Sequence, residues 1–274
     1  KAGAFKVRGA SNAVFGLSEK KAKKGVVTHS SGNHGLSLSY AAGKKGISVT
    51  VVMPHTSSES KKSAVREYGG KIIECEPSIS SREETSSKVL EETGGDFVHP
   101  YNDARVISGQ ATCSMEMLEQ IKDLDAVITP IGGGGMVSGT CLALSNIAPK
   151  IKIFAAEPKN ADDAYRSLKA GYIIADDAPV TVADGLKVPL KDLTWHFVSK
   201  HVEDILTATE DEIIFAMKLI WQRMKIVIEP SSAVPLATII KNKSIFSGKR
   251  VGVIITGGNV DLEKLPWLHN QSDA

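Results

Sequence analysis

The sequence predicts an open α/β fold made of parallel strands with flanking helices, and three observations support this prediction. Short runs rich in Val and Ile alternate with longer amphipathic stretches, which is the pattern of consecutive βαβ units. Two glycine-containing segments stand directly between a predicted strand and a predicted helix. The 274 residues, 42% of them hydrophobic, are enough for one large core or two smaller lobes.

Strands are expected where β-branched residues form short buried runs. In chain order these runs are residues 26–28, 49–53, 72–74, 97–99, 126–129, 151–156 and 251–255. Helices are expected over the amphipathic stretches between them, at residues 32–42, 59–68, 82–92, 106–121, 136–147 and 210–224. The last helix has a defined start, because Thr209 and Glu212 have the spacing of a capping box.

A polar turn at residues 100–103 marks the expected boundary between two lobes. We expect a small domain over residues 25–103 and a large domain made of residues 1–24 and 104–274. A site between the lobes would suit a small ligand. The clearest loop in the second half is residues 174–184, with a turn signal at 176–179.

The composition excludes several other classes of protein. Lysine and arginine number 33 and aspartate and glutamate 31, a net charge of +2, so no basic face suggests a nucleic-acid partner. No run approaches the roughly 18 apolar residues that a membrane span needs. The three cysteines are widely spaced and odd in number, which favours thiols in a reducing compartment and predicts a cytoplasmic location.

The most informative segment contains four consecutive glycines, at positions 132–135, after a predicted strand and before a predicted helix. Their backbone N–H groups, together with the helix dipole, can converge on a phosphate. No register of this loop gives G-x-G-x-x-G, and no Lys-Ser or Lys-Thr follows it. Because Glu157 lies 22 residues after Gly135, near the spacing of a ribose-binding carboxylate, a nicotinamide-dependent oxidoreductase remains a distant alternative.

Three further segments carry polar groups that could bind a cofactor or a substrate. Residues 30–35 follow a strand and open a helix, and they offer hydroxyl, amide and N–H groups to a carboxylate or an oxygen-rich ring. Lys6 lies between Gly3 and Gly9 and is a candidate nucleophile toward a cofactor aldehyde. Thr256 places a hydroxyl at the end of a predicted buried strand.

Taken together, these segments resemble the fold-type II pyridoxal-phosphate enzymes, and within them the serine racemase and serine/threonine dehydratase group. The resemblance covers nearly the whole chain, and its motifs are residues 3–9, 30–35, 132–135, 155–158, 160–163, 182–185, 228–230 and 256–261. It implies a two-lobed architecture like that of the tryptophan synthase β subunit, with the large domain binding the cofactor. The family's first stretch of about 50 residues has no counterpart before Lys1.

The resemblance implies a role in binding pyridoxal phosphate for particular residues. Lys6 would bind the cofactor covalently, Asn33 would bond its ring hydroxyl, and Thr256 would meet its pyridine nitrogen. The phosphate would be held by Gly132, Gly133, Gly134, Gly135 and Met136. Because a neutral hydroxyl cannot keep the ring nitrogen protonated as a carboxylate would, elimination and reprotonation at the α-carbon are expected to compete.

The same resemblance implies a substrate site and an activity. The substrate would be bound by Ser30, Ser31, Asn33 and His34, with Arg82 assisting, and Ser31 would act as the acid or base on the face opposite Lys6. The expected activity is interconversion of L- and D-serine, accompanied by β-elimination of serine to pyruvate and ammonia. The alternative is an L-serine/threonine or 3-hydroxyaspartate dehydratase without significant racemisation.

The resemblance further implies a divalent cation and a nucleotide activator. The side chains of Glu157 and Asp163 and the carbonyl of Ala161 would bind Mg²⁺, Ca²⁺ or Mn²⁺. Four positions match the family's site for ATP, namely Lys1, Tyr68, Lys225 and Asn259. Leu36 and Ala2 replace two other nucleotide-contacting residues, which weakens that expectation. A homodimer that acts on a small amino acid, with no nucleic-acid or membrane partner, is expected.

Overall fold

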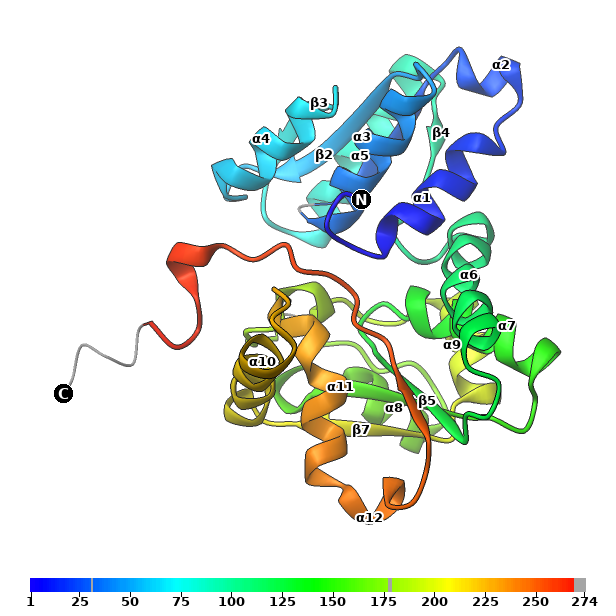
Figure 1. Cartoon of the computed structure of the whole chain (residues 1–274). Helices are drawn as coiled ribbons and strands as arrows, with labels where there is room; N and C mark the ends of the chain where they lie inside the picture. The colour runs from blue at the N-terminus through cyan, green and yellow to red at the C-terminus, as the bar shows by residue number, and fades with distance from the viewer. Residues whose placement is uncertain (31, 177–178, 269–274) are drawn as a thin grey trace. The chain divides into compact units, whose positions relative to one another are not determined.

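The structure is a computed structural model that describes residues 1–30, 32–176 and 179–268. The chain divides into two compact units, Lys1–Gln110 and Ala111–Ala274. Each unit contains a parallel four-stranded sheet with flanking helices, as the sequence predicts (Figure 1). Among the described residues, no helix is both long and apolar enough to cross a membrane.

The first unit contains a sheet in the strand order β3-β2-β1-β4. Its strands are β1 (Val26–His29), β2 (Val49–Pro54), β3 (Lys71–Cys75) and β4 (Asp96–Phe97). Its helices are α1 (Lys6–Phe15), α2 (Glu19–Ala22), α3 (Asn33–Lys44), α4 (Glu59–Glu67) and α5 (Ile79–Thr93). Helix α6 (Ala104–Gln120) begins in the first unit and ends in the second.

Helices cover both faces of this sheet, because alternate residues of a strand point to opposite sides. Val26 and Val51 pack with Leu38 of α3 in one apolar cluster. Val27 packs with Val89 of α5 in another. A parallel sheet that is buried on both faces needs such nearly continuous apolar strands, and this is why the strands could be found in the sequence.

The second unit contains a sheet in the strand order β7-β6-β5-β8. Its strands are β5 (Ala126–Pro130), β6 (Lys152–Pro158), β7 (Asp204–Ala208) and β8 (Val251–Val253). Its helices are α7 (Gly135–Ile147), α8 (Asp163–Ala170), α9 (Asp192–His201), α10 (Glu210–Met224), α11 (Pro230–Lys241) and α12 (Lys243–Phe246). Short 3₁₀ turns are η1 (Lys159–Ala161), η2 (Asp184–Leu186) and η3 (Leu262–Lys264). Its main core joins Ile128 and Phe154 of the sheet to Met217 of α10 and Val234 of α11.

Two strands end earlier than the sequence predicts. Strand β4 ends at Phe97 rather than at residue 99, and the chain then turns, with the backbone N–H groups of Tyr101 and Asn102 donating to His99 Nδ1 at 3.2 and 2.9 Å. Strand β8 ends at Val253 rather than at residue 255. The predicted loop at residues 174–184 contains no helix or strand in its described part before η2.

The two compact units also divide the chain at a different place from the expected domains. Ala10 and Val14 of α1 pack with Leu38 of α3, so residues 1–24, expected in the large domain, lie within the first unit. The division falls inside α6 rather than near residues 100–103. Compactness does not determine which part binds a cofactor, so the assignment of 25–103 as the small domain stays a prediction.

Candidate active site

Each sheet contains one position at which the strand order reverses. In the first unit β1 lies between β2 and β4, and in the second β5 lies between β6 and β8. Open α/β sheets bind ligands at the carboxyl ends of the strands at such positions. Strand β1 leads into residues 30–35, and β5 leads into the four glycines. Both motifs found in the sequence therefore stand where their sheets are expected to bind ligands.

Lys6 is the first residue of α1, and its half-buried amine donates a hydrogen bond of 2.7 Å from Nζ to the carbonyl oxygen of Pro100. Gly3 has a φ of 64°, in the left-handed region that glycine adopts readily, and it forms the turn that leads into the helix. A Cβ at Gly9 would lie 2.7 Å from the carbonyl oxygen of Val106. Both glycines near Lys6 are therefore explained by backbone geometry and packing.

The loop that contains Pro100 is fixed at both ends by Arg105. Its guanidinium forms ion pairs with Asp96, before the loop, and with Asp103, after it. It also donates a hydrogen bond of 2.9 Å to the carbonyl oxygen of Phe97. These contacts hold the acceptor of the Lys6 amine in a defined place.

His34 lies in the first turn of α3 and is buried. Its Nε2 lies 3.2 Å from the carbonyl oxygen of Val98, which can only accept, so Nε2 carries the proton. Burial, followed by the positive charge of Lys6, holds the pKa of His34 well below its usual value. Nδ1 has no partner among the described residues. His34 is therefore neutral, with an acceptor nitrogen available to a ligand.

Further predicted substrate residues stand at the start of α3. Gly32 precedes the helix without a side-chain cap, and Ser30 Oγ accepts a hydrogen bond of 3.3 Å from the Gly32 N–H. Asn33 is the first helical residue and is half-buried. An uncapped helix start of this kind suits a carboxylate. Ser31, the expected catalytic group opposite Lys6, lies outside the described residues.

Arg82, in the first turn of α5, is half-buried and makes no ion pair with any other described residue. Its Nε is buried and has no acceptor among these residues. Helix α5 follows β3, whose carboxyl end lies at the same sheet edge as that of β1. Because a buried N–H group normally has an acceptor, the buried Nε of Arg82, which has none among the described residues, indicates a place for an anionic ligand.

The glycine loop of the second unit leads directly into α7. Gly134 has a φ of 82°, and a Cβ there would lie 2.6 Å from Leu190 Cδ2 and 2.9 Å from Thr194 Cβ. The backbone N–H of Ser138 donates a helical hydrogen bond of 2.8 Å to the carbonyl oxygen of Gly134. The N–H groups that precede Ser138 at the start of α7 therefore have no acceptor within the helix. This buried helix start has neither a side-chain cap nor an acidic residue in its first turn. It fits a phosphate group.

The other members of this loop are equally enclosed. A Cβ at Gly132 would lie 2.7 Å from Leu186 Cα, and Gly133 is buried. Met136 is only 3% exposed and belongs to the first turn of α7. The backbone of the loop, rather than its side chains, therefore supplies the polar groups for an anion.

Thr256 follows β8, the neighbour of β5, and so lies at the same edge of the sheet as the glycine loop. It is buried, and its Oγ1 lies 3.0 Å from Ser232 Oγ in α11. A buried hydroxyl at this edge fits the nitrogen of a pyridine ring. No sequence pattern pointed to Ser232, because the contact joins residues 24 positions apart in different elements.

Glu157 and Asp163 are both buried, at the end of β6 and the start of α8. The two oxygens of Glu157 accept hydrogen bonds from the N–H groups of Ala164, at 3.1 Å, and Tyr165, at 2.8 Å. Burial raises the pKa of Asp163 to about 6, and burial together with the charge of Asp163 raises that of Glu157. Asp163 Oδ2 has no partner in the described part of the chain. A cation would neutralise these two crowded carboxylates.

No group of three or more His, Cys, Asp or Glu side chains placed to hold a metal occurs within residues 1–30, 32–176 and 179–268. The expected set contains only two carboxylates, so it requires the Ala161 carbonyl and water to complete the coordination of a hard cation. Ala161 is buried in η1, between Glu157 and Asp163 in the chain. The residues present are compatible with such a cation.

The four residues expected to bind a nucleotide belong to different units. Lys1 and Tyr68 lie in the first unit, where Tyr68 packs edge-on against Tyr40 with ring centroids 5.3 Å apart. Lys225 and Asn259 are exposed in the second unit. The nucleotide site stays a prediction.

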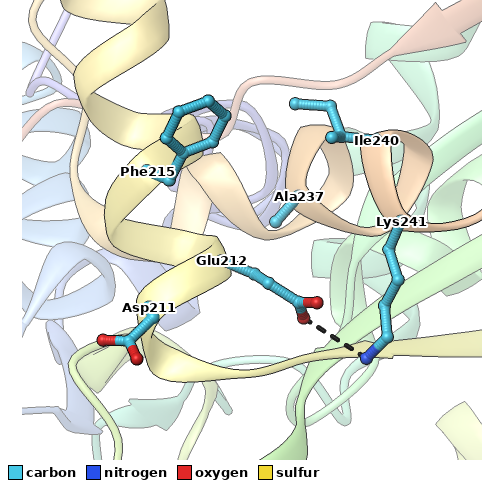
Figure 2. Close-up of a pocket in the computed structure, with 6 residues that line it drawn as sticks. All are labelled: Asp211, Glu212, Phe215, Ala237, Ile240 and Lys241. Carbon is cyan, nitrogen blue, oxygen red and sulfur yellow. Dashed lines mark hydrogen bonds and ion pairs between the residues drawn. The ribbon is translucent and has the colours of Figure 1, made fainter.

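A pocket of about 250 Å³ lies in the second unit (Figure 2). It is lined by residues of α10 and α11, namely Asp211, Glu212, Phe215, Ala237, Ile240 and Lys241. Glu212 and Lys241 form an ion pair of 3.2 Å at its edge. None of the predicted site residues lines this pocket.

Comparisons with known proteins agree with the fold and the motifs. The family model for pyridoxal-phosphate dependent enzymes matches residues 1–257. The chain is 70% identical over 265 residues to the beta-hydroxyaspartate dehydratase of Paracoccus denitrificans (strain Pd 1222), covering 97% of this chain and 84% of that protein. It is 50% identical over 270 residues to the serine racemase of Arabidopsis thaliana, covering 97% of this chain and 82% of that one.

The structure is similar to that of maize serine racemase, with a TM-score of 0.94 and 45% identity, covering 98% of this chain and 83% of the maize chain. The resemblance inferred from the motifs is therefore confirmed, including its two parallel sheets and its cofactor. These matches leave no support for the nicotinamide-dependent alternative. The chain belongs to the pyridoxal-phosphate dependent enzymes and, within them, to the racemases and lyases.

Proposed function

We propose that this protein is a pyridoxal-phosphate-dependent dehydratase that converts 3-hydroxyaspartate to oxaloacetate and ammonia. The identity of 70% to a beta-hydroxyaspartate dehydratase, against 50% to a serine racemase, supports this choice. The structural observation that carries it is Arg82, whose guanidinium has no anionic partner among the described residues. A substrate with two carboxylates supplies one anion for the start of α3 and a second for Arg82.

The reaction breaks the C–H bond at the α-carbon and the C–O bond at the β-carbon, and water leaves. Hydrolysis then restores that water and releases ammonia, so that the net change is loss of ammonia and formation of a 2-oxo acid. Bound pyridoxal phosphate supplies the electron withdrawal that makes the α-proton acidic. In this proposal Lys6 Nζ, oriented by the Pro100 carbonyl, takes that proton.

The other predicted residues would bind and orient. Ser30, Asn33 and the neutral His34 would contact the substrate carboxylate and the cofactor's ring hydroxyl. The backbone of Gly132, Gly133, Gly134, Gly135 and Met136 would hold the phosphate, and the Thr256 hydroxyl would meet the ring nitrogen. The buried amides and the buried hydroxyl support these roles.

We further propose a hard divalent cation at Glu157, Asp163 and the Ala161 carbonyl. Each carboxylate has about four acceptor positions, and Glu157 uses two of them for the amides of α8. Asp163 Oδ2, which has no partner among the described residues, and the raised pKa of both acids support a bound positive charge. A homodimer, a cytoplasmic location and activation by ATP stay predictions from the family resemblance and the composition.

Serine racemisation is the second candidate, and the serine at position 31 favours it. Racemisation needs a proton donor on each face of the substrate carbon, and Lys6 can serve only one. If Ser31 serves the other, Ser31→Ala abolishes interconversion of L- and D-serine while L-serine is still converted to pyruvate. Retention of racemisation in Ser31→Ala, with the cofactor's visible absorption intact, would exclude that role.

The proposed function is tested by identifying products from the purified holoenzyme. Each stereoisomer of 3-hydroxyaspartate, L-serine, D-serine and L-threonine are incubated separately. Ammonia, 2-oxo acids and the opposite enantiomer of serine are then quantified. We expect oxaloacetate and ammonia in equal amounts from 3-hydroxyaspartate. If the racemisation of serine is the fastest of these reactions, the dehydratase assignment is wrong and the protein is a serine racemase.

A further inference from the structure

His99 is bonded to the loop whose carbonyl receives the Lys6 amine. Its half-buried ring lies just after β4, and its Nδ1 accepts hydrogen bonds from the backbone N–H groups of Tyr101, at 3.2 Å, and Asn102, at 2.9 Å. An N–H group can only donate, so Nδ1 carries no proton and the proton of the neutral ring is on Nε2. The ring therefore serves this loop as an acceptor.

The N–H of Tyr101 and the carbonyl of Pro100 belong to one peptide group. This peptide bond is trans, so its N–H and its C=O point in opposite directions. The N–H is bonded to His99 Nδ1, and the carbonyl oxygen accepts from Lys6 Nζ at 2.7 Å. A rotation of this peptide group that turned the carbonyl away from Lys6 would also break the bond to His99. The two hydrogen bonds consequently depend on each other.

Aromatic contacts hold the ring of His99 in the orientation that these bonds require. The ring packs edge-on against three others, with centroid distances of 4.6 Å to Tyr101, 5.5 Å to His29 and 6.0 Å to Phe97. Edge-on packing is a favoured arrangement of aromatic rings. Arg105 holds the two ends of the same loop, whereas His99 acts on the peptide group between them.

We propose that His99 is a positioning residue that sets the direction of the Lys6 amine through the peptide group that follows Pro100. In this role Nδ1 is the functional nitrogen, and another acceptor at the same place serves equally well. The inference rests on the proposed role of Lys6 as the base at the α-carbon. It goes beyond that role by assigning the position of the base to a ring that takes no part in the proton transfer.

Two substitutions separate the roles of the two ring nitrogens. In His99→Asn the amide oxygen takes the place of Nδ1, because an asparagine oxygen readily accepts from the N–H two residues later. In His99→Gln the side-chain amide lies one bond farther out, so it takes the place of Nε2 and leaves the two N–H groups without this acceptor. His55→Gln is the control, because His55 is an exposed histidine of the same unit that lies 3.2 Å from Glu76 Oε2.

The first measurement is the hydrogen exchange of the Tyr101 and Asn102 amides, in both the apoenzyme and the holoenzyme. It reports the bonds to Nδ1 without requiring turnover. Since a net hydrogen bond contributes about 0.5–1.5 kcal/mol, we expect exchange to be about 2- to 10-fold faster in His99→Gln than in the parent. In His99→Asn and His55→Gln we expect the exchange rate of the parent.

The second measurement follows cleavage of the α-C–H bond in the holoenzyme. Rates with unlabelled and α-deuterated substrate are compared, with 3-hydroxyaspartate and L-serine in separate experiments. Because a small misplacement of a reacting group can cost about 100-fold in rate, we expect His99→Gln to lower kcat by about 10- to 100-fold. Its isotope effect should rise and its KM should stay near that of the parent. His99→Asn should have the kcat and the isotope effect of the parent, whereas a merely structural role would change the melting temperature and not the isotope effect.

Three results would overturn the inference. Recovery of kcat in His99→Gln but not in His99→Asn would show that Nε2 acts directly. Unchanged exchange and an unchanged isotope effect in both variants would show that the bonds to Nδ1 do not position the base, and an equal rise of the isotope effect in both would exclude Nδ1 as the functional nitrogen. If His99→Gln does not fold, a raised isotope effect in folded His99→Asn overturns the inference by itself.

Failure of the proposed function would look different. It would appear in the parent as faster turnover of L-serine than of 3-hydroxyaspartate. The comparison among the variants would keep its meaning, because both substrates lose an α-proton. A borohydride label on a lysine other than Lys6 would refute the role of Lys6 itself, while the exchange of the Tyr101 and Asn102 amides would still report the bonds to His99.

Discussion

The amine of Lys6 donates a hydrogen bond of 2.7 Å to the carbonyl oxygen of Pro100. The amine belongs to the first residue of α1, and the carbonyl belongs to the loop after β4 that Arg105 holds at both ends. A group that must react with a cofactor and then move a proton needs a defined position, and this pair provides one within a single unit.

Replacement of this lysine is the first test of the site. Lys6→Ala should remove the visible absorption of the cofactor and lower kcat/KM by at least about 100-fold, because both the covalent attachment and the base are lost. Lys20→Ala, at an exposed lysine of α2, should change neither. Borohydride reduction of the parent followed by peptide mapping should place the label on Lys6. A label on another lysine would refute the assignment.

Replacement of Arg82 should discriminate between substrates. Hydrogen bonds to charged groups contribute about 1.5–3 kcal/mol, or about 10- to 150-fold in affinity. We therefore expect Arg82→Ala to lower kcat/KM for 3-hydroxyaspartate by about this factor and to affect L-serine much less. Arg66→Ala is the matched control, because Arg66 belongs to the same unit and is paired with Glu59 at the surface. Equal losses for both substrates would show that Arg82 binds the carboxylate that they share.

Removal of the proposed cation should destabilise the protein. A ligand at 100 times its dissociation constant stabilises the folded state by about 2.7 kcal/mol, so a chelator should lower the melting temperature and added Mg²⁺ should restore it. In Asp163→Asn this response should disappear. In chelator alone Asp163→Asn should be more stable than the parent, because burial already raises the pKa of Asp163 to about 6.

Asp162→Asn is the control for the cation site. Asp162 precedes Asp163 but forms an ion pair of 2.7 Å with Arg166. Its substitution should leave the response to the chelator intact. A chelator that changes the melting temperature of neither the parent nor Asp162→Asn would contradict the metal site.

The stability of the protein should fall as the pH drops below about 6.5, partly because of His34. Burial and the charge of Lys6 lower the pKa of His34 in the folded state, whereas the unfolded chain takes up the proton near its ordinary value of 6.5. The unfolded state then binds more protons, so stability declines by at most about 1.4 kcal/mol per pH unit for this group.

Urea unfolding of the parent, His34→Gln and His196→Gln at pH 7.5, 6.5 and 5.5 checks this expectation. The glutamine at position 34 keeps a donor for the Val98 carbonyl and should flatten the pH dependence. His196 is exposed, so its substitution should leave the slope as it is in the parent. An identical slope in all three proteins would assign the effect to other groups.

Local patterns in the sequence predicted much of the fold. Helix α10 runs over Glu210–Met224, as expected, because Thr209 and Glu212 form the capping box, with the Thr209 N–H donating to Glu212 Oε2 at 2.8 Å. Helix α1 was missed because Gly3 and Gly9 are typical of loops, whereas Gly9 is required by close packing against Val106. Helix α11 was missed because it contains Pro230 and Pro235, of which the first opens the helix.

The candidate site was predictable only as separate motifs. The glycines and residues 30–35 could be found because each lies between a strand and a helix, and the resemblance assigned their roles. The contacts that give these groups their chemistry join distant parts of the chain, as between Lys6 and Pro100 or between Ser232 and Thr256. Their existence depends on the packing of whole elements, so no pattern of neighbouring residues reveals them.

Internal competition tests the central claim most directly. Equimolar 3-hydroxyaspartate, in its reactive stereoisomer, and L-serine are mixed with the holoenzyme in one tube, and the remaining amount of each is followed by chiral chromatography. The ratio of the two rates of disappearance gives the ratio of the two kcat/KM values. We predict that 3-hydroxyaspartate is consumed at least about 10-fold faster, since it alone supplies an anion for Arg82. Faster loss of L-serine, with D-serine accumulating, would contradict the dehydratase assignment.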